Sequence, residues 1–177
     1  MDQGTEVRDP RTGRLVARPK TGEFARSVAF SPDGKLLFVG LLNGSGQFFS
    51  TRDWRPVGAR IRAQGQRVLY PRFTPDGRTL VTASADGTVQ LWDVAGRKPI
   101  GSPVMVEPDV FVAAALSRDG KNLYALPTGP RGIRLSLSPD VWKRQACLIA
   151  GRELTRREWR DALPSRPYQA VCRDSTA

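Results

Sequence analysis

Three aspartates have the spacing and the chemistry to attract attention first. Asp33, Asp76 and Asp119 recur every 43 residues. Two carboxylates can share general acid–base work when they face one another across a substrate. Each of these aspartates instead belongs to its own four-residue turn. Turn chemistry therefore explains the spacing, and no catalytic pair is predicted. The turns are 31–34, 74–77 and 117–120.

Other catalytic or metal-binding chemistry finds little support. The chain has no histidine, which excludes Ser-His-Asp and Cys-His nucleophiles and histidine-ligated metals. The glycine cluster 43–46 lies between two strand-like segments, without the lysine and following helix of a phosphate-binding loop. We therefore expect no enzyme activity, no catalytic residue, no metal and no cofactor.

The only cysteines are Cys147 and Cys172, which are too few and too far apart for a zinc or redox motif. Two partly buried free thiols are the favoured interpretation, since a reducing cytosol keeps thiols reduced. The alternative is a disulfide that fixes the C-terminal segment.

Composition is typical of a soluble globular protein, with 40% hydrophobic and 25% charged residues among 177. The longest apolar run, 110–116, is too short to cross a bilayer, and the first residues lack the layout of a signal peptide. We expect a soluble, cytoplasmic protein that does not bind membranes.

The net charge of +11 is unusual, and arginine supplies 23 of the 28 positive charges. Such a balance favours acidic partners or nucleic acid. A genome rich in arginine codons would give the same composition without any function. Both interpretations stay open.

Each repeated turn is flanked by strand-like segments. The second repeat predicts strands at 68–73, 78–84, 88–92 and 99–104, with a further turn at Asp86-Gly87. A period of about 40–45 residues is typical of a propeller with four-stranded blades. The first repeat aligns at 27–30, 36–42, 47–50 and 57–61, and the third at 110–116, 122–126 and 133–137.

Residues 82–93 resemble the ending of a WD repeat, preceded by the usual proline-aspartate-glycine turn. In that family a serine, an aspartate, a tryptophan and a histidine brace each blade through hydrogen bonds. Ser84, Asp86 and Trp92 match three of these positions, and Gln64 lies nearest the place of the missing histidine. The resemblance implies an all-β fold, a partial β-propeller of about three four-stranded blades, in residues 1–137.

From Ser138 the sequence changes character. Ser138-Pro139 and Gly151 predict the two ends of a helix, and the capping box Thr155–Glu158 opens a second. We expect a helical tail, 138–177, whose Trp142, Ile149 and Trp159 pack on the propeller. Its sequence is similar to tails that follow bacterial propellers at the end of large signalling proteins.

Partner binding in this family usually involves the loops on one rim of the disc. Here those loops are 18–23, 42–46, 62–66, 85–87, 104–108 and 127–132. The basic tail is a second candidate. The residues that we single out are Lys20, Asn43, Arg62 and Arg131 in the loops and Arg152, Arg156, Arg157 and Arg160 in the tail.

Three blades cannot close a ring, because propellers need roughly four to eight. Residues 7–16 resemble the outer strands of an earlier blade, so we expect the C-terminal part of a longer propeller. Alternatively, strand 14–18 completes the third blade of a second copy beside 133–137, and a homodimer closes six blades.

The leading function is a non-enzymatic protein–protein interaction module, the sensor or scaffold end of a bacterial signalling protein. The alternative is a nucleic-acid binder.

Overall fold

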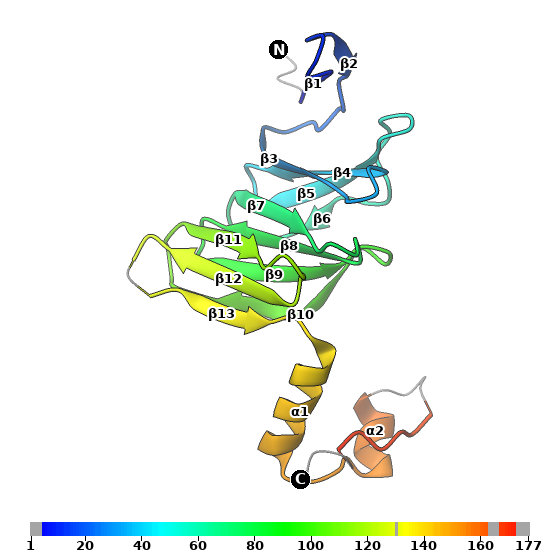
Figure 1. Cartoon of the computed structure of the whole chain (residues 1–177), viewed down its shortest axis with the longest axis vertical. Helices are drawn as coiled ribbons and strands as arrows, with labels where there is room; N and C mark the ends of the chain where they lie inside the picture. Colours follow the sequence, from blue (N-terminus) through cyan, green and yellow to red (C-terminus); the bar gives the residue numbers. More distant parts are fainter. Residues whose placement is uncertain (1–4, 130, 163–166, 173–177) are drawn as a thin grey trace. The chain divides into compact units, whose positions relative to one another are not determined.

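A computed structural model of the chain describes residues 5–129, 131–162 and 167–172 (Figure 1). The chain divides into two compact units, Met1–Leu135 and Ser136–Ala177, and each is treated by itself. The first unit consists of antiparallel sheets, and the second contains two short helices.

The first unit has two complete blades, one three-stranded blade and an N-terminal hairpin among the described residues. The hairpin is β1 (Val7–Arg8) and β2 (Leu15–Ala17). The first blade is β3 (Ala25–Phe30), β4 (Leu36–Leu41), β5 (Ser45–Ser50) and β6 (Ile61–Arg62). The second is β7 (Val68–Phe73), β8 (Thr79–Ser84), β9 (Thr88–Asp93) and β10 (Lys98–Met105). The third is β11 (Val112–Leu116), β12 (Asn122–Pro127) and β13 (Ile133–Ser136).

This arrangement confirms the predicted partial propeller with a helical tail. The sheets follow one another in chain order, with β7 beside β3 and β11 beside β7 (Figure 1). One strand differs from the prediction: 57–61 does not form the fourth strand of the first blade. The pairing with β5 is interrupted: Pro56 pairs with Phe49, the N–H of Val57 donates to the carbonyl of Phe48, and pairing resumes at Ile61–Arg62, with Gly58 in a left-handed conformation, φ 71°, between them.

The repeated turns have one geometry in all three blades. The hydroxyl of Ser31 donates to Asp33 Oδ1 at 2.6 Å, and Thr74 and Ser117 do the same for Asp76 and Asp119. The glycine that ends each turn has a φ of 69–70°. Glycine adopts a left-handed conformation without steric strain, because it has no Cβ. These turns therefore join β3 to β4, β7 to β8 and β11 to β12 with little strain.

Apolar side chains fill the space between the first two blades. Phe38, Phe48, Val68, Leu80 and Trp92 form one buried cluster, in which the rings of Phe38 and Phe48 meet edge to face at 5.0 Å. The opposite face of the first blade holds a second cluster, against which Val7 of the N-terminal hairpin packs. Strand β4 is thus covered on both faces, which explains its consecutive apolar residues.

The second unit has helices α1 (Pro139–Ala150) and α2 (Arg156–Ala162). As predicted, Ser138 precedes a proline at the start of α1, and Gly151 ends it in a left-handed conformation. No described helix has the length and apolar character to cross a membrane.

The cysteines correct one prediction: the free-thiol interpretation is wrong. Cys147 in α1 is bonded to Cys172, with their Cα atoms 5.4 Å apart. The chain after α2 turns back to α1, which brings together two residues 25 positions apart in sequence. The separation of the two cysteines in sequence therefore did not indicate that they are bonded.

Candidate functional site

Asp86 organises the turn between β8 and β9. Its Oδ1 accepts hydrogen bonds from the backbone N–H and hydroxyl of Thr88, at 3.0 and 2.6 Å. Its Oδ2 accepts the N–H of Gly65 at 2.8 Å, which ties loop 62–66 to this turn. Partial burial opposes ionisation, yet the bonds from Thr88 and Gly65 outweigh it and lower the pKa of Asp86. The carboxylate is therefore a fixed anchor for the loop.

The structure joins the predicted bracing residues in two groups. The hydroxyl of Ser84 accepts the N–H of Asp86 at 3.3 Å, so these two are linked. The indole N–H of Trp92 instead donates to the hydroxyl of Thr82 at 2.9 Å. The sequence analysis did not predict Thr82 as the partner of Trp92. A threonine on the strand next to a core tryptophan is a signal that could have indicated this role.

Gln64 takes part in the Asp86 group. Its side chain is buried, and its amide nitrogen donates to the carbonyl and the hydroxyl of Thr88, at 2.8 and 2.9 Å. Loop 62–66 is thus held at two points, by Gln64 to Thr88 at the start of β9 and by Gly65 to Asp86 in the turn before it. Such support gives a loop the rigidity that a binding surface needs.

The four candidate rim residues are exposed in the first unit. Lys20 precedes β3, Arg62 ends β6, and Arg131 lies between β12 and β13. Asn43 is also exposed, but its carboxamide oxygen accepts the N–H and hydroxyl of Ser45, at 3.0 and 2.6 Å. Asn43 and Arg62 are brought close together, because Asn43 bonds to Ser45 and Arg62 pairs with Ser45 across the sheet.

Comparison with known families identifies the second blade. Residues 62–93 match the family model described as "WD domain, G-beta repeat". This segment of the chain is similar to a WD40 repeat. The matched segment contains Gln64, Ser84, Asp86 and Trp92, together with the missed Thr82. WD40 repeats are protein-interaction modules that are in general non-catalytic. The comparison with curated proteins gave no match.

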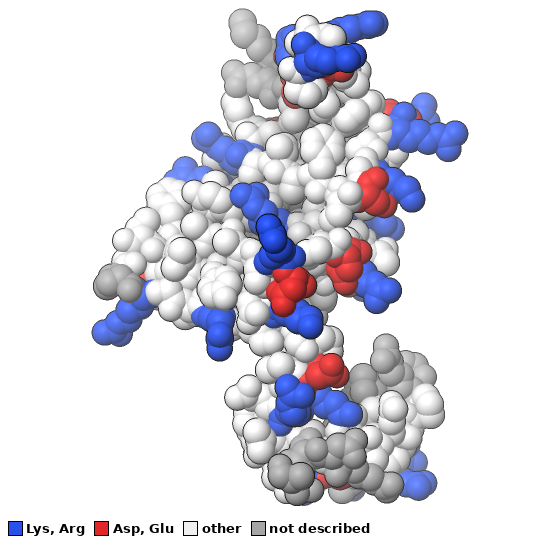
Figure 2. All heavy atoms as spheres, viewed as in Figure 1, with Lys and Arg blue, Asp and Glu red and all other residues white. Residues whose placement is uncertain are grey.

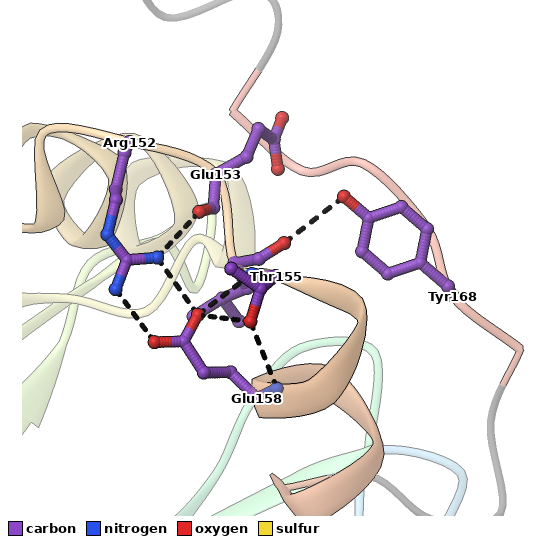
Figure 3. A network of polar contacts seen from close by, with 6 residues as sticks. Arg152, Glu153, Thr155, Glu158 and Tyr168 are labelled. Carbon is purple, nitrogen blue, oxygen red and sulfur yellow. Dashed lines mark hydrogen bonds and ion pairs between the residues drawn. The ribbon is translucent and has the colours of Figure 1, made fainter.

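Outside the WD40 repeat, the tail has its own polar network around Glu158 (Figure 3). Arg152 donates to both carboxylate oxygens of Glu158, at 2.9 and 2.7 Å. Glu158 also accepts the N–H and hydroxyl of Thr155, and the N–H of Glu158 donates back to that hydroxyl at 3.2 Å. This is the predicted capping box. Arg152, followed by Thr155, lowers the pKa of Glu158 far below its usual range.

Glu153 and Tyr168 hold the last described segment. The carboxylate of Glu153 accepts the N–H groups of Val171 and Cys172, at 3.0 and 2.6 Å. The hydroxyl of Tyr168 donates to the carbonyl of Leu154 (Figure 3). The guanidinium of Arg156 lies 5.4 Å from the centre of the Tyr168 ring. Arg152 and Arg156 thus have internal roles.

Basic side chains are spread over the visible face of the molecule, with a few acidic ones between them (Figure 2). Arg157 and Arg160, like the basic rim residues, are exposed. Among the described residues, no group of three histidine, cysteine, aspartate or glutamate side chains could hold a metal ion.

Proposed function

We propose that the chain is a non-enzymatic protein-binding module whose rim loops contact an acidic surface of the partner. The observation that carries this proposal is the anchoring of loop 62–66 to Asp86 and Thr88, through Gly65 and Gln64. The exposed Arg62 begins this loop, so its position is fixed before a partner binds. Preorganisation of this kind lowers the entropic cost of association.

The charge of the rim residues indicates the charge of the partner surface. Lys20, Arg62 and Arg131 are exposed and basic. Rim charges of one sign speed the encounter with a partner of the opposite sign and select against partners of the same sign. An acidic protein surface is therefore the favoured target.

The tail adds a second basic element, in which Arg157 and Arg160 are available for contact. Trp142 and Ile149 are exposed apolar side chains of α1. As part of the same proposal, Trp142 and Ile149 dock on the propeller, so that residues 1–137 and 138–177 act together. The similarity of the tail to those of bacterial signalling propellers supports a role as the sensor or scaffold end of such a protein.

The proposed location is the cytoplasm, where the Cys147–Cys172 bond has a specific consequence. Cytosolic disulfides are usually transient, whereas those of oxidising compartments persist. Alkylation of thiols in intact source cells, followed by mass analysis, distinguishes the two. Reduced cysteines support the cytoplasmic location, and a constitutive bond contradicts it.

Binding is tested in two steps. Proteins captured on the purified chain from its source cells are identified, and each is then produced and titrated alone with the chain. The variant Lys20→Glu/Arg62→Glu should weaken binding of a genuine partner. The matched control Arg118→Glu/Lys121→Glu reverses two charges at the repeated turn of the third blade and should not. Equal affinities for the two variants would refute a rim interface.

Nucleic-acid binding is the second candidate, favoured by the net charge of +11. Phosphate contacts release counterions, so affinity would fall steeply with salt. Random duplex DNA should bind more weakly than about 10⁻⁴ M at physiological salt if the chain is a protein-binding module. Micromolar binding that collapses at higher salt, and weakens when Arg152, Arg156, Arg157 and Arg160 become glutamine, would replace the proposal with this alternative.

A further inference from the structure

A hollow of about 400 Å³ lies between the repeated turns of the first and second blades. Pro32, Leu36, Pro75 and Val94 give it apolar walls, and Asp33 and Asp76 contribute carboxylates. This size falls in the range of small-ligand sites, about 300–1,000 Å³. The turns lie at the ends of the blades opposite to the β4–β5 and β8–β9 turns of the rim, so the hollow is a separate site.

Successive turns are spaced unequally beside the hollow. The turns are arranged so that the proline of one faces the glycine of the next. A Cβ atom built on Gly77 would lie 3.6 Å from Pro32, whereas one on Gly120 would lie 2.5 Å from Pro75. The second and third turns are thus in closer contact than the first and second.

Both carboxylates of the hollow are ionised at neutral pH. The hydroxyl of Ser31 and the N–H of Lys35 donate to Asp33, and those of Thr74 and Arg78 donate to Asp76. These bonds, with the hydroxyl the larger cause in each case, lower the pKa of both groups. All four bonds use Oδ1. The ammonium group of Lys35 lies 3.8 Å from Oδ2 of Asp33, with both side chains largely exposed, and such pairs are weak.

We propose that this hollow binds an arginine side chain of the protein partner, with the guanidinium between Asp33 and Asp76 and the aliphatic stem along the apolar walls. The inference rests on the proposed function and gives it a second contact. Asp33 and Asp76 bring two carboxylates to one hollow, and the neighbouring cations Lys35 and Arg78 lie outside its lining. A guanidinium has five N–H donors in a planar fork, so it can serve two carboxylates at once. Its stem gains from apolar contact while the charge stays near water.

The test uses n-butylguanidinium chloride as the probe, titrated into the isotope-labelled full chain and followed by NMR. The backbone N–H groups of Lys35 and Arg78 report on the site, because each donates to a carboxylate that the probe would contact. Lys121 is the matched control within the same chain. Its N–H donates to Asp119 at 3.0 Å in the third turn, which does not line the hollow. Neutral butyramide controls for apolar binding alone.

The proposal predicts saturable shifts at Lys35 and Arg78, with Lys121 unchanged and butyramide without effect. Asp33→Asn/Asp76→Asn keeps the hydrogen-bond acceptors but removes both charges, and should weaken binding about fivefold to tenfold. Asp119→Asn should leave it unchanged. The peptide acetyl-Leu-Arg-Leu-amide should bind at least as tightly as the free probe, since the proposed occupant is a side chain.

Four results would overturn the inference. Equal shifts at Lys121 would mean general attraction to turn carboxylates, and unshifted Lys35 and Arg78 amides would mean that no site exists. A peptide that binds less tightly than the free probe would exclude an arginine within a protein. Shifts of the same amides on raising the concentration of the chain alone would assign the site to a second copy. None of these measurements needs the partner, so failure here leaves the rim proposal to its own test.

Discussion

The bond between Trp92 and Thr82 offers the sharpest test of how the WD40 repeat is held together. Trp92 is 4% exposed and Thr82 is fully buried, and 2.9 Å separates the indole nitrogen from the hydroxyl oxygen. Thr82→Val replaces the hydroxyl with a methyl group of nearly the same shape. Packing is therefore kept while the indole N–H loses its acceptor.

A buried donor left without a partner costs about 1–3 kcal/mol. We expect Thr82→Val to lower the free energy of unfolding of the first unit by that amount. The assay is urea unfolding of the full chain, followed by far-UV circular dichroism, with the slope against urea checked for constancy. The midpoint should fall in proportion.

A double-mutant cycle isolates the hydrogen bond from other effects of the valine. In a Trp92→Phe background the donor is already absent, so Thr82→Val should be nearly neutral. The coupling between the two sites should be at least about 1 kcal/mol. Equal costs of Thr82→Val in both backgrounds would refute the claim that this bond braces the blade.

Four further predictions concern the tail and the open ends of the propeller. Trp159 is 7% exposed and packs on Tyr168, so Trp159→Ala should destabilise the second unit by about 3–5 kcal/mol, and an unchanged melting temperature would contradict its burial. Reduction of Cys147–Cys172 opens a loop with a sequence separation of 25 and should cost about 3.5 kcal/mol, measured by thermal melts with and without dithiothreitol. The pKa of Glu158 is lowered from 4.5 in the folded chain, so its contribution to stability is present above pH 4.5 and lost as the pH falls below it. Glu158→Gln should therefore flatten the pH–stability curve below pH 4.5. If two copies close a six-bladed ring, light scattering should give twice the 19.5 kDa chain mass and deletion of residues 1–18 should abolish the dimer, whereas a cooperative monomer favours the longer-propeller hypothesis.

The repeats made the first unit predictable from sequence. Each turn carries its own geometry in four residues, so the strands beside Asp33, Asp76 and Asp119 could be located from local chemistry alone. Capping signals at Ser138, Gly151 and Thr155 located the helices in the same way. Local rules decide these features because their interacting groups are close along the chain.

Contacts between distant residues could not be predicted in this way. The pairing of Trp92 with Thr82, rather than Ser84, depends on how two strands are aligned across the sheet. The disulfide depends on the path of the chain between α1 and Cys172. The hollow depends on how the first and second turns pack beside Leu36 and Val94. None of these distances is encoded in a single segment.

Hydrogen exchange of the complex with a purified partner shows whether the rim loops bind protein, as proposed. The account predicts slower exchange in loops 42–46, 62–66 and 85–87 when the partner is bound, with the turn 117–120 unchanged as an internal reference. Protection confined to other segments, with these three loops exchanging as in the free chain, would contradict it.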